Sequence, residues 1–461
     1  MALVLNQRVT WRLAIPVVID VVLVVLSVVA SAFLVMGADF RVQVGNPSVL
    51  LKLFLLAAVF PFAMYLADVY ESRSDENLRG LFVRLMQSLG VTALAFAAIY
   101  ALLPGLIVGR GVFVLAVGFI LGLVPLWRTA FDQVVTHFAP GERILFIGTK
   151  PAAVTLAREL RARQRDLGVE VVGFLDAERS GVRHPGIIGD LADITELVDR
   201  HQVDRVIVSV EDARGTLPMA EFLDLKLRGI RFDHLATVYE EFTGRIAVEN
   251  LRPSWLVFSD GFREPRAMVL AKRAGDVFVS GVALMVAAPV MLAVALAIRL
   301  TSAGPVFYHQ VRVGQRGRHF TVHKFRTMRV DAEALSGPVF ASERDPRVTP
   351  IGEFLRRTRL DELPQIWNIL SGEMSLVGPR PERPEFVKDL TKQIPFYGQR
   401  HVVKPGLTGW AQVRNGYTSD LAGTIEKLQY DLFYIKNLSV VLDLVILFST
   451  VKTVLRRQGA R

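Results

Sequence analysis

The chain of 461 residues contains no cysteine, and that absence removes whole classes of chemistry from consideration. Without cysteine the protein has no disulfide bond, no thiolate nucleophile and no cysteine-ligated metal. The histidines offer no substitute, because His309, His319 and His401 are too scattered to suggest a metal cluster. The sequence also lacks internal repeats and low-complexity tracts.

Apolar residues, in contrast, are abundant: they make up 51% of the chain and give a mean hydropathy of +0.37. This value is high for a soluble protein and predicts membrane segments, while the length predicts two or three domains. The formal net charge of +10 fits nucleic acid, anionic lipid or a phosphorylated substrate as a partner. In so apolar a chain the last two are favoured, since basic residues beside membrane spans meet the anionic cytoplasmic leaflet. Nucleic acid is not expected.

Four apolar runs dominate residues 1–135, and each approaches the roughly 20 residues that cross a bilayer. They are Leu13–Met36, Val49–Ala67, Leu81–Leu103 and Val112–Trp127. Arg8 and Arg12 precede the first run and Arg128 follows the last, so the positive-inside rule places both ends of the bundle in the cytoplasm. The start has no small-residue cleavage site, which predicts a retained helix and not a signal peptide. Residues 1–135 are therefore predicted to form a four-helix transmembrane bundle of a multi-pass membrane protein.

A second pattern begins near Gly141, where β-branched runs alternate with helical stretches. Strands are expected at Arg143–Gly148, Val169–Leu175 and Arg205–Val210, and helices at Pro151–Arg163 and Leu191–His201. Alternation of this kind predicts a parallel sheet with helices on its faces over residues 141–262. The turn after the first strand, Gly148-Thr-Lys-Pro-Ala-Ala, lacks the second and third glycines of a dinucleotide-binding loop. A structural or regulatory module is therefore favoured over a nucleotide-binding one.

Another apolar run spans Asp276–Ile298, with Pro289 near its middle. Lys272 lies before it and Arg299 after it, so both flanks prefer the cytoplasm. Proline removes a backbone donor and bends a helix, and a re-entrant hairpin in one leaflet would satisfy both observations. A proline-kinked span is the alternative, because crossing helices tolerate such prolines. The hairpin is the preferred interpretation.

The residues after Gly304 are more polar, rich in Gly-Pro turns, and carry the candidate chemistry. Their final apolar stretch, Leu438–Leu455, is interrupted by Asp443 and Lys452, which is typical of an interfacial helix and not of a span. Together with the apolar run at 276–298, residues 268–461 are predicted to form one catalytic domain.

Asp361 and Glu362 stand just before a short apolar helical segment. One interpretation is helix capping, since Asp is a preferred N-cap and Glu in the first turn complements the dipole. The other is phosphate chemistry, because a helix N-terminus attracts phosphate and a cation or arginine would offset the two carboxylates. Mg²⁺ bound through carboxylates and substrate phosphates is the usual arrangement. One carboxylate could then attack phosphorus while the other holds the metal, and the residues alone leave either assignment open.

Basic residues accompany this pair in two segments. Arg380 and Arg383 lie in a proline-rich run whose stiff backbone lets arginines grip a diphosphate at low entropic cost, although a plain surface loop has the same composition. Upstream, Lys324 and Arg326 alternate with apolar residues and would share one face of a strand, or belong to a solvated edge strand. The loop Lys404–Gln412, with its Gly-Pro turn and tryptophan, fits packing against a base or a headgroup as well as it fits a structural turn.

Taken together, these motifs resemble the bacterial sugar transferases, the polyprenyl-phosphate sugar-1-phosphate transferases that initiate exopolysaccharide or O-antigen assembly. The resemblance covers 272–461 and rests on motifs in a fixed order: Ala303-Gly-Pro-Val-Phe-Tyr-His-Gln-Val-Arg-Val-Gly, Lys324-Phe-Arg-Thr-Met, Leu360-Asp-Glu-Leu-Pro-Gln, Met374-Ser-Leu-Val-Gly-Pro-Arg-Pro and Lys404-Pro-Gly-Leu-Thr-Gly. The earlier regions are similar to the long form of the family, with a four-helix membrane bundle and a Rossmann-like domain. The stretch Leu251–Phe262 is similar to a subgroup found with exosortase-type polysaccharide systems.

The resemblance implies a membrane protein of mixed α and α/β architecture and a reaction in two halves. Asp361 would attack the β-phosphate of a UDP-sugar, release UMP and form a phosphosugar-aspartyl intermediate. Undecaprenyl phosphate would then accept the phosphosugar. Glu362 corresponds to the Mg²⁺-binding partner of Asp361, while Lys324, Arg326 and Arg380 match basic positions that bind the substrate.

The same resemblance implies a place in the bacterial inner membrane, with the catalytic domain on the cytoplasmic side and in contact with membrane lipid. A homodimer fits the long form. The sequence departs from the family at Ala288-Pro289, where the re-entrant helix of other members has Ser-Pro. The serine hydrogen bond to the freed backbone is therefore missing, while the proline that makes the bend remains.

Two other functions compete with this interpretation. A membrane-anchored NAD-dependent sugar-nucleotide dehydratase or epimerase would need a glycine-rich fingerprint and a Tyr-x-x-x-Lys pair. The turn at Gly148 fails the first requirement, and Tyr430–Tyr434 offers no lysine at the required spacing. A non-catalytic membrane regulator is disfavoured by the intact Asp361-Glu362 pair.

Overall fold

The computed structural model describes residues 11–70, 78–106, 109–138, 141–176, 186–210, 217–248, 261–262, 265–332, 345–415 and 420–455. Within these ranges the chain forms two compact units, one ending at Val238 and the other beginning at Tyr239. Most of the stretch Leu251–Phe262, which resembles the exosortase-associated subgroup, lies outside the described residues.

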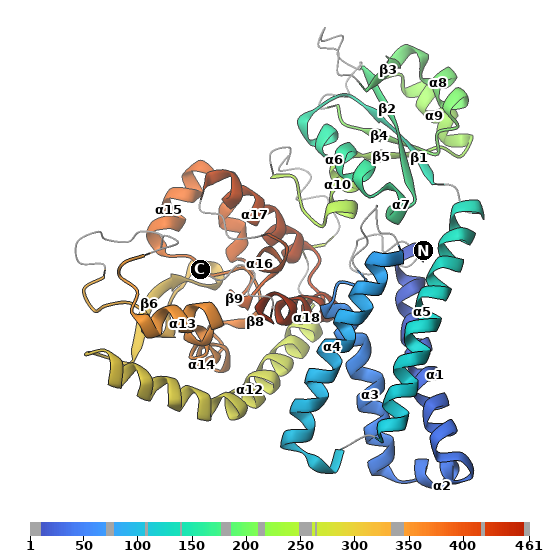
Figure 1. The fold of residues 1–461 in the computed structure, drawn as a ribbon. Helices are drawn as coiled ribbons and strands as arrows, with labels where there is room; N and C mark the ends of the chain where they lie inside the picture. The colour runs from blue at the N-terminus through green and yellow to red at the C-terminus, as the bar shows by residue number, and fades with distance from the viewer. Residues whose placement is uncertain are drawn as a thin grey trace. The chain divides into compact units, whose positions relative to one another are not determined.

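The first unit begins with long apolar helices (Figure 1). These elements are α1 (Trp11–Met36), η1 (Gly37–Asp39), α2 (Phe40–Val44), α3 (Pro47–Leu66), α4 (Leu78–Leu102), η2 (Pro104–Leu106) and α5 (Arg110–Phe138). The helices α1, α3, α4 and α5 all contain segments long and apolar enough to cross a membrane. They confirm the predicted membrane segments, although α5 continues through Pro125 and ends at Phe138, beyond the expected limit at Trp127.

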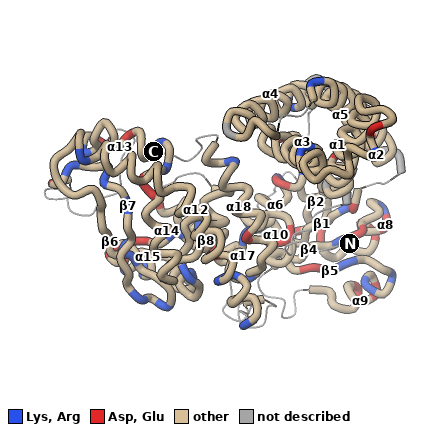
Figure 2. Tube along the Cα trace, turned by 90° about the horizontal axis from the view of Figure 1, so that it is seen from below, with Lys and Arg blue, Asp and Glu red and all other residues tan. Residues whose placement is uncertain are grey.

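The membrane helices pack around a core that holds one buried ion pair. Helix α1 packs against α3 and α5, and α4 packs against the same two helices. Asp20 of α1 is fully buried and lies 2.5 Å from the guanidinium of Arg128 of α5. Arg128 also donates a hydrogen bond of 2.9 Å to the carbonyl of Val69. Because a buried charge persists only when it is paired, this contact ties α1 to α5. Lys and Arg are otherwise sparse along these helices (Figure 2).

The α/β part of the first unit is a parallel five-stranded sheet in the order β3-β2-β1-β4-β5. Its elements are β1 (Glu142–Ile147), α6 (Pro151–Ala162), α7 (Gln164–Leu167), β2 (Val169–Asp176), β3 (Ile187–Asp190), η3 (Leu191–Asp193), α8 (Ile194–His201), β4 (Arg205–Val208), α9 (Met219–Leu227) and β5 (Arg231–His234). In the central strands, Phe146 is level with Phe174 and Ile207. The order is that of the doubly wound α/β class, and it confirms the predicted parallel sheet.

The turn after β1 shows why a glycine stands there. Gly148 has a φ of +88°, and a Cβ at this position would lie 2.8 Å from the hydroxyl of Ser209. That hydroxyl donates to the carbonyls of Ile147 and Gly148. Gly148 therefore serves a close contact between β1 and the end of β4.

The second unit contains a long helix and a compact core. After α10 (Leu235–Thr243), which begins at the end of the first unit, its elements are α12 (Arg266–Thr301), β6 (Phe307–Val313), η5 (Gln315–Gly317), β7 (His319–Phe325), α13 (Pro350–Thr358), η6 (Leu360–Glu362), α14 (Gln365–Ser371), β8 (Ser375–Val377), α15 (Pro384–Gln393), η7 (Tyr397–His401), β9 (Gly406–Thr408), α16 (Trp410–Arg414), α17 (Leu421–Lys436) and α18 (Val440–Leu455). Strands β6 and β7 form an antiparallel hairpin, while the short β8 and β9 pair in parallel. Leu432, Phe433 and Tyr434 of α17 fill the centre of the main core together with Trp410.

Helix α12 contains the apolar run predicted to be re-entrant. It is continuous over 36 residues with Pro289 inside it, and Figure 1 shows that it bends along its length. A proline within a helix accounts for such a bend. Its length and hydropathy would also allow it to cross a membrane, so re-entry stays a prediction that depends on the basic residues at its two ends.

Helix α18 is the stretch predicted to lie along the membrane surface. Its Asp443 does not face outward: it accepts a hydrogen bond of 2.6 Å from Lys272 of α12 and one of 2.8 Å from the hydroxyl of Tyr434. The exposed side chains of α18 are large and apolar, among them Leu444, Phe448 and Leu455. Asp443 therefore anchors α18 to the core, and the opposite face of the helix is apolar.

Candidate active site

The Asp361-Glu362 pair is presented by a sharp reversal of the chain. Helix α13 ends at Thr358, and Arg359 then adopts a left-handed conformation with a φ of +56°. Left-handed backbone is unfavourable for a residue with a Cβ, and it persists where the surrounding structure enforces it. The two carboxylates follow at once in η6, before Pro364 and α14.

The elements on either side hold this turn in place. Asn368 of α14 is fully buried and donates to the carbonyl of Thr321 on β7 at 2.7 Å, while its own oxygen accepts from the amide of His323. Arg273 of α12 donates to the last carbonyls of α14, those of Ile369 and Leu370, at 2.6 and 2.7 Å. Hydrogen bonds to β7 and from α12 therefore fix the position of α14, which follows the Asp361-Glu362 turn.

The apolar residues beside the pair connect it directly to the long helix. Leu360 and Leu363 pack in a cluster with Val294 and Ile298, which lie in the last turns of α12. The carboxylates therefore lie next to the helix that carries the membrane-type segment.

Two cations meet on one carboxylate oxygen of Glu362. Lys324 Nζ donates to Glu362 Oε1 at 2.9 Å, and Arg380 Nη2 donates to the same oxygen at 2.7 Å. Burial alone would raise the pKa of Glu362, but the charges of Arg380 and Lys324 hold it well below its usual range. Glu362 is therefore ionised and carries two positive partners.

Asp361 has a different environment from its neighbour. Its side chain is buried, and within the described residues its carboxylate has no hydrogen-bond partner. Burial raises the pKa of Asp361 to about 6; Lys324 opposes that rise and Glu362 adds to it. Neither residue caps a helix, since the N-cap of α14 is Pro364 and no side-chain cap bond is formed there. The capping interpretation of the pair is thus not what the structure shows.

Of the four basic residues expected in the site, the structure brings Lys324 and Arg380 to the carboxylates and places the other two elsewhere. Arg326 follows the end of β7 and donates to the carbonyls of Ser302 and Ala303 at 3.0 and 2.6 Å. Arg383 lies 3.7 Å from Glu385 and over the ring of Phe386 at the start of α15. Lys324 and Arg326 were predicted to share one face of a strand. The strand β7 ends at Phe325, so Arg326 lies beyond it and its side chain has different partners.

Two arginines near the pair were missed at the sequence level. Arg356 of α13 donates to the hydroxyl of Thr327 at 2.9 Å, and its charge favours the ionised form of Asp361. Arg359 lies 3.9 Å from Glu362 Oε2. The available signal was the run of arginines in the last turn of α13, which on a helix places charge near the residues that follow its end.

The tryptophan of the Lys404–Gln412 loop belongs to the core. Trp410 is 2% exposed, and its indole nitrogen donates to the carbonyl of Gly244 at 3.0 Å. The loop's glycines serve close backbone contacts, since a Cβ at Gly406 would lie 2.1 Å from the amide nitrogen of Gly378. Of the two interpretations left open for this loop, the structure favours the structural turn.

The donor set at the turn fits a magnesium ion. The Asp361 carboxylate makes no hydrogen bond to the described residues, and Glu362 Oε2 has Arg359 no nearer than 3.9 Å. Two adjacent carboxylates with free oxygen positions, completed by substrate phosphates and water, form the usual Mg²⁺ arrangement. No cluster of three or more acidic or histidine side chains occurs in the part of the chain that the structure describes, so a protein-only cage is not present there.

Comparison with known proteins gives the family. The model of the bacterial sugar transferases matches residues 267–457, which contain the whole site. A UDP-glucose:undecaprenyl-phosphate glucose-1-phosphate transferase of Xanthomonas campestris pv. campestris is 33% identical over 96% of this chain and 93% of its own length. The chain belongs to the bacterial sugar transferase family. The motif-based prediction of this family is confirmed.

Other relatives match parts of this sugar transferase. A UDP-N-acetylgalactosamine-undecaprenyl-phosphate N-acetylgalactosaminephosphotransferase of Aeromonas hydrophila is 43% identical over 50% of the chain and 53% of its own length. The exopolysaccharide production protein PSS of Rhizobium leguminosarum bv. phaseoli is 44% identical over 41% of the chain and 97% of its own length. Residues 65–221 match a second family model, described as a CoA-binding domain, which covers part of the bundle and most of the α/β region.

Proposed function

We propose that this protein transfers a sugar 1-phosphate from a UDP-sugar to undecaprenyl phosphate, releases UMP, and so initiates exopolysaccharide or O-antigen synthesis. The observation that carries the proposal is the pair in η6: a buried Asp361 without a hydrogen-bond partner in the described chain, beside a Glu362 bound by Lys324 and Arg380. The names of relatives that match most of the chain or its catalytic part support the same reaction.

Asp361 is the better nucleophile of the two carboxylates. Its oxygens make no hydrogen bond to the described residues, whereas one oxygen of Glu362 is held by two cations. In the first half-reaction an Asp361 oxygen bonds to the β-phosphorus, the bond from that phosphorus to the bridging oxygen breaks, and UMP leaves. In the second, an oxygen of undecaprenyl phosphate attacks the same phosphorus and Asp361 leaves as a carboxylate. An acyl phosphate is reactive enough for both steps.

The neighbouring charges prepare the site for an anionic donor. The two carboxylates face four positive charges, because Arg356 and Arg359 lie close to the pair in addition to Lys324 and Arg380. The local charge is therefore positive and attracts a diphosphate. Asp361 and Glu362 would hold Mg²⁺, which when bound offsets the charge of a carboxylate attack on a diphosphate. Glu362 also fixes the direction in which Arg380 extends.

The membrane location of the site follows from α12 and α18. Both helices expose large apolar side chains such as Phe278, Leu292 and Leu300 of α12 and Phe448 of α18. Basic residues at both ends of α12 favour a re-entrant position with the catalytic core on the cytoplasmic side of the inner membrane. There a polyprenyl phosphate headgroup meets a soluble UDP-sugar. A homodimer remains a prediction from the long form of the family.

The test is UMP release by the full-length protein in nanodiscs with undecaprenyl phosphate, Mg²⁺ and a panel of UDP-sugars that includes UDP-glucose and UDP-N-acetylgalactosamine. Release that depends on both donor and lipid phosphate supports the proposal. Incubation with donor alone should leave a phosphosugar on Asp361, detected by peptide mass spectrometry. If the protein inserts normally into the membrane but consumes no UDP-sugar, the result would contradict the proposal and favour the non-catalytic regulator.

A further inference from the structure

The segment that carries Arg380 is held through its carbonyl groups. The carbonyl of Pro379 accepts from the amide of Gly406 at 2.9 Å, that of Arg380 from Arg400 at 3.0 Å, and that of Pro381 from Arg312 at 3.1 Å. Pro379 and Pro381 have no N–H group to donate. The position of the segment therefore depends on which groups reach its carbonyls.

Arg400 is the most deeply buried of these donors. It lies in η7 and is 6% exposed. Its Nε and Nη2 donate to Oδ2 of Asp431 at 3.1 and 2.8 Å, and its Nη1 donates to the hydroxyl of Tyr397 at 2.8 Å. Asp431 and Tyr397 are each 2% exposed. A buried guanidinium is costly unless its donors are satisfied, and here every nitrogen has a partner in the protein.

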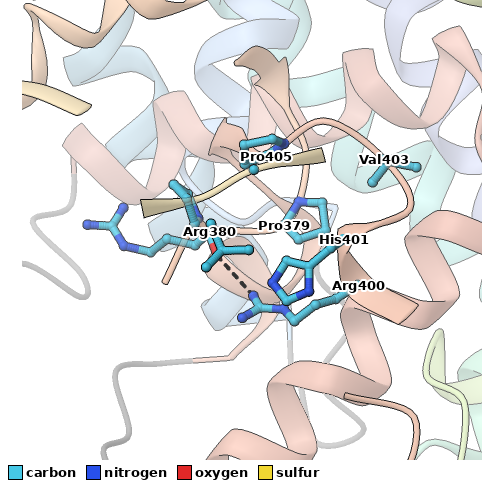
Figure 3. Close-up of a pocket in the computed structure, with 9 residues that line it drawn as sticks. Pro379, Arg380, Arg400, His401, Val403 and Pro405 are labelled. Carbon is cyan, nitrogen blue, oxygen red and sulfur yellow. Dashed lines mark hydrogen bonds between the residues drawn. The ribbon is translucent and has the colours of Figure 1, made fainter. Parts of the chain in front are cut away.

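The side chain and the main chain of Arg380 contact different residues, on different sides of the segment. Figure 3 shows the Arg400 guanidinium bonded to the main-chain carbonyl of Arg380, while the Arg380 side chain extends away from Arg400 and His401. At its far end the Arg380 guanidinium meets Glu362 at 2.7 Å. A continuous path of contacts thus runs from Asp431 through Arg400 and the Arg380 peptide to Glu362.

The polar network does not resemble a second binding site. The cavity beside it holds about 10 Å³, no more than one water molecule, and is lined by Pro379, Arg380, Arg400 and His401 among others. Burial lowers the pKa of His401 to about 4, so this imidazole is neutral at ordinary pH. Arg400 therefore acts on protein groups and not on a ligand.

We propose that Arg400 is a positioning residue for the transfer reaction: held by Asp431 and Tyr397, it fixes the Arg380 peptide so that the Arg380 guanidinium faces Glu362 and the donor diphosphate. The inference rests on the proposed function. Arginine suits this task because one planar fork reaches an acid, a hydroxyl and a carbonyl together, which the ammonium of lysine does not. Misplacing a substrate-gripping group by about 1 Å can cost on the order of a hundredfold in rate.

A double-mutant cycle distinguishes positioning from a general structural role. Arg400→Lys, Arg380→Ala and the double variant are prepared as full-length protein in nanodiscs, and kcat and KM for the UDP-sugar are measured from UMP release. If Arg400 acts through Arg380, Arg400→Lys lowers kcat/KM by about tenfold or more in the wild-type background. In the Arg380→Ala background the same change lowers it by less than about twofold, since the group it positions is already gone.

A matched control comes from another ion pair of the same unit. Arg245 is paired with Glu426 at 2.9 Å and lies over the rings of Tyr239 and Tyr430. Arg245→Lys is expected to lower thermal stability without the background-dependent effect on kcat/KM. If Arg400→Lys folds poorly, Tyr397→Phe can replace it, because this variant removes only the partner of Arg400 Nη1. It should lower kcat/KM by a smaller factor, and again only when Arg380 is present.

The outcomes separate the two proposals. Equal losses from Arg400→Lys in both backgrounds, with wild-type protein active, overturn the positioning role and leave the function intact. A wild-type protein that releases no UMP from any donor overturns the function and the positioning role with it. If the residual turnover of Arg380→Ala is too low to measure, equilibrium binding of UDP replaces the turnover measurement. If Arg400→Lys weakens UDP binding only when Arg380 is present, the result supports the inference. Equal weakening of UDP binding in both backgrounds contradicts it.

Discussion

Two parallel strands of this protein are each followed by a glycine, but the segments after the two glycines differ completely. In the α/β region, β1 leads into Gly148, whose Cβ would lie 2.8 Å from the Ser209 hydroxyl. In the catalytic unit, β8 leads into Gly378, whose Cβ would lie 2.4 Å from the carbonyl of Lys404. Both glycines serve close packing at the end of a strand. The first is followed by Thr149-Lys150 and helix α6, and the second by the stiff segment that carries Arg380 to Glu362.

The difference shows that the strand ends do not by themselves define a phosphate site. Near Gly148 the polar hydroxyl of Ser209 is satisfied by the carbonyls of Ile147 and Gly148. Near Gly378 the structure gathers buried carboxylates and cations, and leaves Asp361 without a hydrogen-bond partner in the described chain. Because no hydrogen bond to the described residues occupies the Asp361 oxygens, they are available to a ligand, as expected where function and not folding sets a residue.

The largest expected effect is that of removing the nucleophile. Asp361→Asn keeps the size of the side chain and removes the oxygen that bonds to phosphorus. UMP release should fall by roughly 10³ or more, as it does when a nucleophile is removed from other covalent enzymes. Membrane insertion and thermal stability should be unchanged or slightly improved, because a buried carboxylate becomes a neutral amide. Near-normal turnover of this variant would eliminate Asp361 as the nucleophile.

The second effect concerns Glu362 and the metal. Glu362→Gln leaves Lys324 and Arg380 without their shared carboxylate and should lower kcat by about 10² to 10³. Chelation of divalent cations should abolish wild-type UMP release, and added Mg²⁺ should restore it. The variant should need more Mg²⁺ for half-maximal rate than the wild type. An unchanged Mg²⁺ requirement in Glu362→Gln would assign the cation to other groups.

How much of this site could be predicted from the sequence depends on the range of the contacts involved. Asp361 and Glu362 are adjacent in the chain, and the stiffness of the Arg380 segment follows from its own prolines. These local features were enough to predict a phosphate-handling site with carboxylates and arginines. The family resemblance placed Lys324 and Arg380 in the substrate site, but their contact with one oxygen of Glu362 was not predicted, since β7, η6 and the end of β8 are separate segments of the sequence.

Two contacts were not predicted, and both join residues far apart in the sequence. Arg326 was expected beside Lys324, but the strand ends at Phe325 and the guanidinium reaches Ser302 and Ala303 instead. Asp443, expected only as an interruption in an interfacial helix, pairs with Lys272 of a helix more than a hundred residues earlier. The sequence around these residues does not indicate such long-range partners. The interfacial position of Leu438–Leu455 stays a prediction. The fold classes were easier to predict, because apolar length and strand–helix alternation are properties of continuous segments.

A third prediction uses the raised pKa of Asp361. The attacking form is the carboxylate, and burial raises the pKa of Asp361 to about 6. Below that pH the acid is protonated, so kcat/KM should fall by about tenfold for each unit of pH lost. A cation held by the carboxylate favours its ionised form, so the acidic limb should move to lower pH as the Mg²⁺ concentration rises. A profile that is flat from pH 5 to 8 at limiting Mg²⁺ would contradict this role.

The smallest effect is expected in the α/β region, and it completes the comparison of the two strand ends. Lys150 follows Gly148 at the start of α6, where a phosphate-binding loop would place its contacts. Because that turn lacks the further glycines that let a backbone approach a pyrophosphate, Lys150→Ala should change kcat and KM for the UDP-sugar by less than about twofold. Arg380→Ala, assayed in parallel, should lower kcat/KM by about a hundredfold or more. A tenfold loss in Lys150→Ala, with thermal stability unchanged, would instead show that the α/β region contributes to donor binding.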